Sequence, residues 1–291
     1  MTKHHIGVIG GSGLYAMEGL TDVREQYVRT PFGDASDQVV MGTLGDTRFY
    51  FMPRHGRGHL IPPHRINYRA NIYALKLVGA QQLVSISAVG SLQEHMRPGD
   101  LVAVDQYIDR TKSRTDTFFE DDGLVAHVSL ADPTDPALSD CLAQAGERAG
   151  ARVHRGGTYV CMEGPQFSTR AESMLYRSWG AHVIGMTNLP EARLAREAEL
   201  PYASLALVTD FDCWHEEEAD VSVAHVVEVM QRNVATARRI LASIEAWPDP
   251  STSPASNALA HALITDRNRV SPQAREKLSL LVSRYLPVEG A

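Results

Sequence analysis

Short apolar runs alternate along this chain with longer stretches whose apolar residues recur at helical spacing. Five runs have the length and composition of buried strands, and most of them end at a glycine or at charged residues. These runs are residues 6–11, 48–55, 82–91, 182–188 and 202–210. Strands that alternate with helical stretches are typical of a wound α/β fold.

Four stretches have the apolar period of helices. They span residues 67–80, 168–180, 189–197 and 222–244. The second begins with a capping box from Thr169 to Glu172, in which each side chain bonds to the other residue's backbone N–H. Ala171, Leu175 and Trp179 then recur on one helical face. The last stretch is predicted to be one long amphipathic helix.

This pattern predicts a single wound α/β domain over residues 1–247, with a central mixed β-sheet flanked by helices. Residues 247–257 are rich in Pro and Ser and are interpreted as a linker. Beyond them, residues 258–265 and 271–286 are predicted to form two short helices. Residues 248–291 are therefore predicted to be a linker with a C-terminal helical extension, and the sequence does not decide between a lid and a packing arm.

The composition argues against several classes of function. The chain has 291 residues, a formal charge of −7 and a pI near 5.9, whereas nucleic acids and anionic membranes are bound by basic surfaces. No apolar stretch approaches the roughly 20 residues of a membrane span, and no signal peptide is recognised. Cys141, Cys161 and Cys213 are too few and too scattered for a disulfide framework or a zinc site. We therefore expect a cytoplasmic protein.

The first predicted strand ends in a glycine turn, Gly11-Ser12-Gly13. The turn fits the start of a dinucleotide-binding fingerprint, but that fingerprint also needs an acidic residue about 20 positions further on, at the end of the next strand. Residues 28–37 are turn-rich instead. A purely structural turn and an anion cradle, in which backbone N–H groups and the Ser12 hydroxyl hold an oxyanion, both remain open.

The second predicted strand ends at Arg54 and His55. A guanidinium at this position can hold a phosphate through two parallel hydrogen bonds, and His55 can add a donor. The alternative for Arg54 is a surface ion pair. A metal site formed by His55, His59 and His64 is disfavoured, because the intervening glycines and prolines prevent the helix that their spacing would need. No metal site is predicted.

The last predicted strand ends in Asp210 and Asp212, with Phe211 between them. On an extended backbone, residues two apart point to the same side, so both carboxylates can face one ligand while Phe211 points away. Two such carboxylates can hold a metal, share a proton or read the edge of a ligand. They can also be ordinary residues of a turn.

Several longer stretches resemble one enzyme family. They include GGSGLY, TPFGDASD, RHGRGH, NYRANIYALK, EGPQFSTRAES and LVTDFDCW, in order within about residues 5–245. These stretches are similar to the 5′-methylthioadenosine phosphorylases, in the trimeric purine nucleoside phosphorylase family. The resemblance implies phosphorolysis of 5′-methylthioadenosine to adenine and 5-methylthioribose 1-phosphate in purine and methionine salvage. It also implies a homotrimer, orthophosphate as co-substrate, and no metal or organic cofactor.

The resemblance assigns individual residues to three groups. The phosphate-binding group is Ser12, Arg54, His55, Ser87, Ala88 and Thr187. The substrate-binding group is Phe167 against the base, Met186 under the ribose, and Asp210, Phe211 and Asp212. The specificity group is Ser168, Val223, Val226 and His127, the last from a neighbouring subunit. The two valines are expected to give the 5′-methylthio group apolar walls.

Asp210 and Asp212 are the expected catalytic residues. A carboxyl group held near-neutral by burial can give a proton to N7 of the departing purine. A carboxylate can accept a hydrogen bond from the 6-amino group and repels a 6-oxo oxygen, so the pair favours adenine. Asp210 ends the apolar run and is predicted to be the more desolvated and to serve N7, while Asp212 is predicted to read the 6-amino edge.

Two other functions are compatible with parts of this pattern. A purine nucleoside phosphorylase of broader or 6-oxopurine specificity, acting on inosine, guanosine or methylthioinosine, would share the phosphate site. A nucleotide sensor without catalysis would share the fold, although a complete phosphate site would then have no use. Release of adenine only in the presence of orthophosphate separates the enzyme from the sensor.

Overall fold

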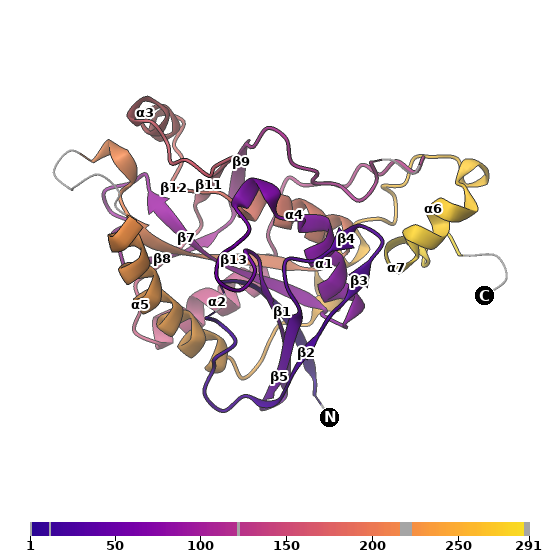
Figure 1. The fold of residues 1–291 in the computed structure, drawn as a ribbon, viewed down its shortest axis with the longest axis horizontal. Helices are drawn as coiled ribbons and strands as arrows, with labels where there is room; N and C mark the ends of the chain where they lie inside the picture. The colour runs from indigo at the N-terminus through magenta and orange to yellow at the C-terminus, as the bar shows by residue number, and fades with distance from the viewer. Residues whose placement is uncertain (1, 12, 121–122, 216–222, 288–291) are drawn as a thin grey trace.

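The computed structural model of the chain describes residues 2–11, 13–120, 123–215 and 223–287. Its centre is a twisted sheet of eleven strands within these residues, with helices on both faces (Figure 1). Parallel and antiparallel neighbours both occur in this sheet. The predicted α/β class with a central mixed sheet is therefore confirmed.

The strands of the main sheet follow the apolar runs of the sequence. They are β1 (His4–Gly10), β2 (Thr21–Gln26), β5 (Val39–Leu44), β6 (Thr47–Pro53), β7 (Gln82–Ser91), β8 (Leu101–Val104), β9 (Gln106–Arg110), β10 (Val153–Arg155), β11 (Thr158–Met162), β12 (Val183–Gly185) and β13 (Tyr202–Asp210). Two short strands, β3 (Arg29–Thr30) and β4 (Gly33–Asp34), form a separate hairpin. The predicted strands over residues 82–91 and 202–210 coincide with β7 and β13.

The helices lie between the strands and in the C-terminal region. They are α1 (Tyr68–Leu77), α2 (Pro136–Arg148), α3 (Arg170–Ser178), α4 (Asn188–Glu197), α5 (Val223–Ala242), α6 (Pro272–Lys277) and α7 (Ser279–Val282). Short 3-10 turns follow β13 and occupy much of the C-terminal region. All four helices predicted before residue 245 are confirmed as α1, α3, α4 and α5.

Four neighbouring strands of the sheet, β13, β7, β1 and β6, run parallel. β8 joins β13 and β5 joins β6 in antiparallel fashion. Strands of a parallel sheet are buried on both faces, which explains the nearly continuous apolar runs in the sequence. The carboxyl ends of the four parallel strands meet at one edge of the sheet, where open α/β sheets bind ligands.

Hydrophobic side chains pack on both faces of the sheet. Along β1, Ile9 joins one cluster and Val8 joins another, because successive side chains of a strand point to opposite faces. The first cluster contains residues of α1 and α4, and the second contains residues of α2 and α5. The sheet is therefore the middle of three layers.

The apolar face predicted for α3 is present but is not buried. The capping box between Thr169 and Glu172 forms as predicted. However, Leu175 and Trp179 are each 45% exposed, and the helix turns Ser173 and Tyr176 inward instead. α3 therefore presents an apolar surface to solvent in the single chain.

The C-terminal region differs from the prediction in one respect. Residues 258–265 form turns rather than a helix, and Leu263 makes an isolated β-bridge with Ala126. The helical prediction for residues 271–286 is confirmed by α6 and α7. Leu278, between these two helices, and Val282 of α7 join the same hydrophobic cluster as Phe118. Tertiary contact with this segment explains why local sequence preference did not decide the structure of residues 258–265.

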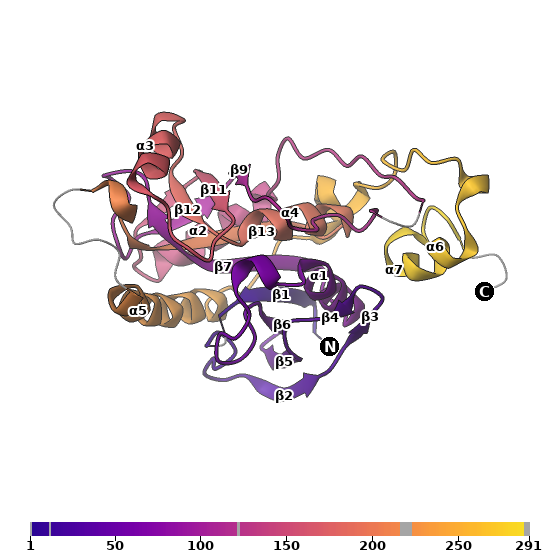
Figure 2. The ribbon, with the colours of Figure 1, turned by 45° about the horizontal axis from the view of Figure 1, so that its top comes forward.

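The described residues of segments 118–128 and 258–286 together form a structure that we call the arm. Figures 1 and 2 show these two segments side by side, projecting from the end of the molecule opposite α3. The backbone N–H of His127 donates to the carbonyl of Ala262 at 2.9 Å, and that of Ile264 donates to Val125 at 3.1 Å. The arm is thus held together by hydrogen bonds between distant parts of the sequence.

The last turn of α4 fastens the arm to the body of the molecule. Glu197 accepts hydrogen bonds from the Thr117 hydroxyl and the Phe118 N–H, both at 2.7 Å. Glu199, just beyond the helix, accepts from the Leu259 N–H at 2.9 Å and the Tyr285 hydroxyl at 2.6 Å. Each half of the arm is therefore bound to a different carboxylate.

None of the helices in the described ranges combines the length and the apolar composition that crossing a membrane requires.

The buried carboxyl group of Glu197 should make stability depend on pH. Burial raises the pKa of Glu197 to about 7 from a model-compound value of 4.5. The folded chain therefore holds this proton more tightly than the unfolded chain, so the group stabilises the fold at low pH and this contribution is lost as the pH rises towards 7. We expect the difference in unfolding free energy between wild type and Glu197→Gln to change by up to about 1.4 kcal/mol per pH unit across this window.

Urea unfolding of both proteins between about pH 5 and pH 8 measures this difference. Glu18→Gln is the matched control, because Glu18 is exposed and its replacement should leave the pH dependence of wild type unchanged. Parallel curves for wild type and Glu197→Gln would show that Glu197 titrates alike in the folded and unfolded chains.

Candidate active site

The residues expected to bind substrate gather where β1, β6, β7 and β13 end. Arg54 and His55 follow β6, Ser87 and Ala88 lie on β7, and Asp210 ends β13. Gly10 pairs with Pro53, and Asp210 pairs with Gly90, so the strand ends are neighbours in the sheet. The topology therefore brings together residues that are more than a hundred positions apart in the sequence.

The glycine turn after β1 does not open a helix. Residues 14–20 form turns before β2, and the Leu14 N–H bonds to the Gly11 carbonyl at 3.2 Å. A dinucleotide-binding loop needs a helix at this point, so that interpretation is excluded. The Gly13 carbonyl accepts hydrogen bonds from Arg238 of α5, with Nε at 2.6 Å. The turn is thus braced by α5, and Ser12 itself lies outside the described residues.

Arg54 is buried, and its guanidinium is directed at the protein interior. Nε and Nη2 donate to the two carboxylate oxygens of Glu191 at 2.7 and 3.2 Å. Nη1 donates to the Ile86 carbonyl at 2.8 Å, and Nη2 also reaches Ser85 Oγ at 2.6 Å. The prediction that Arg54 offers two parallel hydrogen bonds to phosphate is therefore wrong, because Glu191 occupies that side of the guanidinium. The surface ion pair is also excluded.

The Arg54–Glu191 pair is the centre of a buried polar network. Ser85 donates to Glu191 Oε2 at 2.7 Å, and the Tyr202 hydroxyl lies 3.3 Å from the same oxygen. Burial alone would lower the pKa of Arg54, but the adjacent charge of Glu191 and its hydrogen bond raise that pKa. Arg54 is therefore a fixed cation whose charge is balanced inside the protein.

His55 is held in one tautomer. Its Nδ1 lies 2.8 Å from the Ile61 carbonyl, which can only accept, so Nδ1 carries the hydrogen. Burial lowers the pKa of His55 to about 4, with a further contribution from Arg54. The ring is thus neutral near pH 7, and its Nε2 is an acceptor. The prediction that His55 adds a hydrogen-bond donor is wrong for this neutral state.

Ser87 and Thr187 place two hydroxyl groups near the same strand ends. Ser87 is buried, and in the described part of the chain its hydroxyl oxygen has no hydrogen-bond partner. Thr187 is the N-cap residue of α4, and its side chain makes no capping hydrogen bond. Backbone N–H groups at a helix N-terminus attract anions. The Ser87 hydroxyl therefore retains its capacity to bind an anionic ligand, whereas the Thr187 hydroxyl donates to Asn188 Oδ1 at 3.3 Å.

The two aspartates lie together, although not on an extended strand. Asp212 has a φ of +50°, and its N–H donates to Asp210 Oδ1 at 2.8 Å, so the chain turns immediately after β13. A Cβ added to Gly90 would lie 3.0 Å from Asp210 Oδ1 and 3.2 Å from Asp212 Cβ. Both side chains thus border Gly90, through a turn rather than through strand alternation as predicted.

The burial of the two aspartates is the reverse of the prediction. Asp212 is 7% exposed, whereas Asp210 is only partly buried and also accepts from the Thr209 hydroxyl at 2.6 Å. Burial raises the pKa of Asp212, the charge of Asp210 raises it further, and Ser173 partly offsets the rise.

Within the described residues, neither Asp212 Oδ2 nor Ser173 Oγ has a partner in hydrogen-bonding geometry. Ser173 therefore lowers the pKa of Asp212 electrostatically, without a direct hydrogen bond. The turn after β13 buries the Asp212 side chain. The apolar run in the sequence does not indicate this turn.

The turn that carries Asp212 is braced by α3. Trp214 Nε1 donates to the Ser91 carbonyl at 2.7 Å, and the Arg177 guanidinium lies 3.3 Å from the centre of the Trp214 ring. Phe211 is 8% exposed and stacks on His215, with ring centres 4.8 Å apart. The Phe211 ring is therefore buried against His215.

The loop after β11 carries the residues expected against the base and ribose. Phe167 is 49% exposed, and the Ser168 carbonyl accepts from Cys213 Sγ at 3.3 Å. A Cβ on Gly164 would lie 2.5 Å from Met186 Sδ, so Met186 packs directly over Gly164. The loop is thus in contact with both the Asp212 turn and the segment before α4.

Of the expected specificity residues, His127 is not brought to the site by the single chain, and the side chains of two others are not described. Val223 and Val226 belong to the first turns of α5, but their side chains lie outside the described residues. His127 lies on the arm, at the opposite end of the molecule from α3 (Figures 1 and 2). The structure therefore does not place His127 beside its own Asp210 and Asp212.

Sequence reasoning missed two buried charged residues, Glu191 and Arg114. Glu191 was part of a predicted helix but was given no role; an acidic residue in the first turn of a buried helix was the available signal. Arg114 follows β9 in a polar segment with no recognisable motif, and its contacts only become visible in three dimensions.

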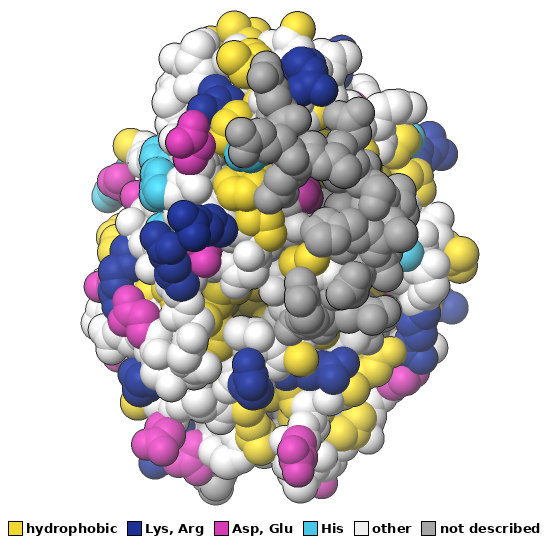
Figure 3. Space-filling view, turned by 90° about the vertical axis from the view of Figure 1, so that its left-hand side faces the viewer, with side chains coloured by type: hydrophobic (Ala, Val, Ile, Leu, Met, Phe, Trp, Pro, Cys, Tyr) yellow, Lys and Arg dark blue, Asp and Glu magenta, His cyan; other side chains and the backbone are white. Residues whose placement is uncertain are grey.

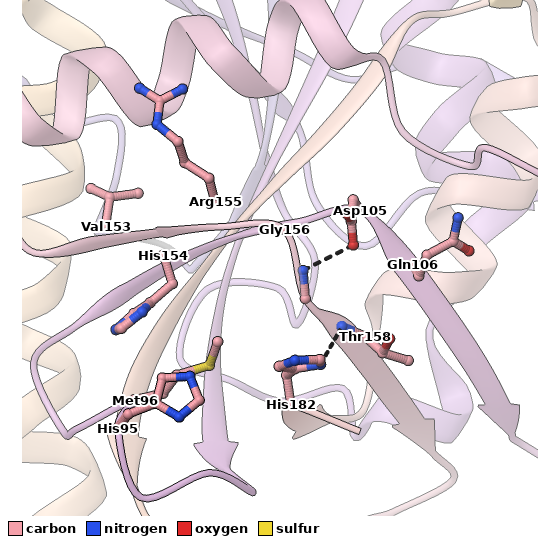
Figure 4. Close-up of a pocket in the computed structure, with 11 residues that line it drawn as sticks. His95, Met96, Asp105, Gln106, Val153, His154, Arg155, Gly156, Thr158 and His182 are labelled. Atoms are coloured by element: carbon pink, nitrogen blue, oxygen red, sulfur yellow. Dashed lines mark hydrogen bonds between the residues drawn. The ribbon is translucent and has the colours of Figure 1, made fainter. Parts of the chain in front are cut away.

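An open hollow of about 700 Å³ lies elsewhere, beside β8 and β10. Figure 4 shows His95, His154 and His182 along its lining. His154 pairs with Asp100 at 2.8 Å, and His182 Nδ1 accepts from the Thr158 N–H at 3.0 Å. No expected nucleoside residue lines this hollow. In the described ranges, no cluster of His, Cys, Asp or Glu has an arrangement that could hold a metal ion.

The end of the molecule that carries α3 has a mixed surface. Figure 3 shows hydrophobic side chains there next to clusters of basic ones. The exposed apolar residues near this end are Phe167, Met174, Leu175 and Trp179. The arm exposes Val125 and Ile264 at the other end.

Comparison with known proteins identifies relatives of the whole chain. Residues 5–245 match the sequence pattern of the phosphorylase superfamily. The S-methyl-5′-thioadenosine phosphorylases of Geobacter sulfurreducens and Thermosynechococcus vestitus are each 53% identical, over 97% of this chain and 99% of theirs. A crystal structure of a methylthioadenosine phosphorylase from an Antarctic soil metagenomic library matches with a TM-score of 0.90 and 47% identity, over 97% of this chain and 99% of that one.

A second solved structure was determined with a ligand. The methylthioadenosine phosphorylase of Schistosoma mansoni, in complex with adenine, matches with a TM-score of 0.79 and 36% identity, over 97% of this chain and 98% of that one.

The buried Arg54–Glu191 pair should be essential to stability. We expect Glu191→Gln to lower the free energy of unfolding by about 3–5 kcal/mol, because it leaves a buried guanidinium charge without its counter-ion. The double variant Arg54→Met with Glu191→Leu should recover part of this loss, since it removes both charges. Asp46→Asn, which breaks the exposed Lys3–Asp46 pair, is the control and should leave stability close to that of wild type, because solvent screens an exposed ion pair. Urea unfolding measures these variants together with the single variants Arg54→Met and Glu191→Leu. A double variant as unstable as the sum of these two single variants would contradict the pairing.

Proposed function

Because this chain belongs to the phosphorylase superfamily, we propose that it cleaves 5′-methylthioadenosine with orthophosphate. The products are adenine and 5-methylthioribose 1-phosphate. The observation that carries the proposal is the meeting, at one edge of the sheet, of the Ser87 hydroxyl, which has no partner among the described residues, the N-terminus of α4 and a pair of carboxyl groups. The relatives named above support the choice of substrate, and the adenine complex of one solved relative supports the choice of base.

In this proposal, phosphate is bound mainly by neutral hydroxyl and backbone groups rather than by a free positive charge. Arg54 is already paired with Glu191, so it contributes at most its remaining Nη1 hydrogen. The other contacts come from the hydroxyls of Ser12, Ser87 and Thr187 and the backbone at Ala88. His55, which is neutral, can only accept a hydrogen bond from a protonated phosphate oxygen through Nε2. Orthophosphate is a co-substrate that both stabilises and traps the ribosyl cation, and no metal or organic cofactor takes part.

The base is read by the two aspartates in exchanged roles. Asp212 is the more buried carboxyl with the raised pKa, so we assign to it the proton donated to N7. Asp210 is partly exposed and fixed by Thr209 and the Asp212 N–H, which suits an acceptor for the 6-amino group. Phe167 and Met186 flank the base and the ribose. A 6-oxo substrate would meet repulsion at Asp210.

The active unit in this proposal is a homotrimer in the cytoplasm. The exposed apolar residues of α3 and those of the arm lie at opposite ends of the chain, which suits a head-to-tail contact that closes into a ring. Such a contact would bring His127 of the arm to the site of the neighbouring subunit, where Val223 and Val226 form the other walls of the 5′ pocket. Sedimentation of the purified protein at the mass of one chain would contradict the trimer.

Adenine release should require orthophosphate. We expect turnover of 5′-methylthioadenosine by the wild-type protein to fall to background when phosphate is removed and to be insensitive to a chelator. Ser87→Ala should raise the KM for phosphate by roughly 10–100-fold, because a hydrogen bond to a charged group contributes about 1.5–3 kcal/mol. Ser251→Ala, at an exposed position in the turn Pro250–Thr252, is the control. Release of adenine at full rate without phosphate would show hydrolysis instead.

The two aspartates should differ in their effects on the base. Asp212→Asn should lower kcat by about 10²-fold or more for 6-amino and 6-oxo nucleosides alike, because it removes the proton donor. It should also abolish the loss of kcat at high pH that deprotonation of Asp212 causes in wild type. Asp210→Asn should lower kcat/KM for adenine nucleosides by a factor equivalent to about 1–3 kcal/mol of transition-state stabilisation. It should raise kcat/KM for 6-oxo nucleosides.

The measurement for the aspartates is kcat/KM for 5′-methylthioadenosine and methylthioinosine in wild type and both variants. If Asp210→Asn does not alter the ratio of these two values, Asp210 does not read the base. If Asp212→Asn keeps the wild-type kcat for both nucleosides, Asp212 is not the proton donor.

A further inference from the structure

Arg114 lies beneath the candidate site, between two loops. Its side chain is 1% exposed. Nη2 donates to the carbonyl of Glu163 at 2.6 Å and to that of Met162 at 3.2 Å, and Nη1 donates to the carbonyl of Met186. A single guanidinium therefore binds the segment before Phe167 and the segment before Thr187.

The same guanidinium reaches a third segment. Nη1 lies 3.0 Å from the Tyr68 hydroxyl, which in turn donates to the Pro63 carbonyl at 3.0 Å. Pro63 belongs to the loop that also contains Ile61, the hydrogen-bond partner of His55. Arg114 thus connects, directly or through one hydroxyl, the loops that carry the expected contacts to base, ribose and phosphate.

The bond to Met186 fixes the orientation of one peptide group. The carbonyl of Met186 and the N–H of Thr187 belong to the same planar unit. When Arg114 holds the carbonyl, the N–H is directed away from it, and it lies 3.4 Å from the Tyr159 hydroxyl. The residue proposed under the ribose and the residue proposed at the phosphate are therefore oriented together.

We propose that Arg114 is the positioning residue of the active site, which sets the separation between the part that binds the base and the part that binds ribose and phosphate. This inference rests on the proposed function. Phosphorolysis breaks a bond between the base and C1′ of the ribose while phosphate approaches the same carbon. The two halves of the site must therefore be held at a fixed distance, and a misplacement of about 1 Å costs about 10²-fold in rate.

Lysine cannot replace Arg114 in this role. A guanidinium presents five N–H groups in a rigid plane, and those of Arg114 are spread over three carbonyls and a hydroxyl. A lysine ammonium is a point charge with three donors on a flexible stem. The Glu163 carboxylate, whose Oε1 lies 3.7 Å from Arg114 Nε, balances the charge without a direct hydrogen bond from that nitrogen. Planarity, more than charge, is the property that this position uses.

The test measures whether a free guanidinium ion restores the chemical step. We expect Arg114→Ala to lower kcat by about 10²-fold and to raise the KM for 5′-methylthioadenosine. The KM for phosphate should change less than the KM for 5′-methylthioadenosine, because Ser87 and Ala88 are positioned by β7, while Thr187 is oriented through Arg114. Millimolar guanidinium should raise kcat of this variant at least tenfold, and urea, which has the same shape without the charge, should not. Arg114→Lys should keep a kcat at least tenfold below wild type.

Arg155→Ala is the matched control. Arg155 forms exposed ion pairs with Glu147 and Asp140, so its loss should leave kcat unchanged, and guanidinium should have no effect on it. The inference is overturned if folded Arg114→Ala keeps kcat and both KM values within threefold of wild type. It is also overturned if guanidinium raises the melting temperature without raising kcat.

Two further outcomes are distinguishable. If Arg114→Ala does not fold, Arg114→Lys carries the test, and a wild-type kcat in that variant overturns the inference. If the wild-type protein itself does not release adenine in the presence of phosphate, the proposed function fails, whatever the role of Arg114.

Discussion

The buried pair of Arg54 and Glu191 is the constraint on which the rest of the structure depends. Removing two charges from water is costly, and their attraction compensates only when the geometry is close and the remaining hydrogen bonds are made. Here the two charges are bridged by two hydrogen bonds, and Ser85 and the Ile86 carbonyl satisfy further donors and acceptors. Arg54 follows β6, Ser85 lies on β7 and Glu191 lies on α4. The pair therefore fixes α4 against the edge of the sheet where the parallel strands end.

α4 thereby contacts both the candidate site and the arm. Its first residues include Glu191 and follow Thr187, so its N-terminus belongs to the active site. Its last turn and the residue beyond hold the arm through Glu197 and Glu199. Arg193 adds ion pairs to Asp109 at 2.7 Å and to Asp116. These two aspartates lie on either side of Arg114 in the sequence. A helix of ten residues thus links the catalytic edge, the guanidinium beneath it and the surface proposed to meet a second chain.

Local patterns in the sequence were sufficient for the framework but not for the site. β7 and β13 could be delimited because a strand buried on both faces leaves a continuous apolar run. The capping box at Thr169 is equally local. In contrast, the partner of Arg54 lies 137 residues away, and no pattern around Arg54 distinguishes a phosphate ligand from a buried counter-ion. The burial of Asp212 depends on a backbone turn with positive φ at a residue other than glycine, which the sequence does not signal.

Gly90 limits how this site can change by mutation. A single methyl group at this position would press on Asp210 Oδ1 at 3.0 Å, on Asp212 Cβ at 3.2 Å and on Ile184 Cγ2 at 3.3 Å, all at once. Contacts this short require the neighbours to move, and each is held by its own strand or turn. Replacing Gly90 with any larger residue therefore requires the residues around the two carboxyl groups to move as well. Descendants of this sequence can acquire a different base preference by altering the charge or hydrogen-bonding character of the aspartates, while the shape around Gly90 is inherited unchanged.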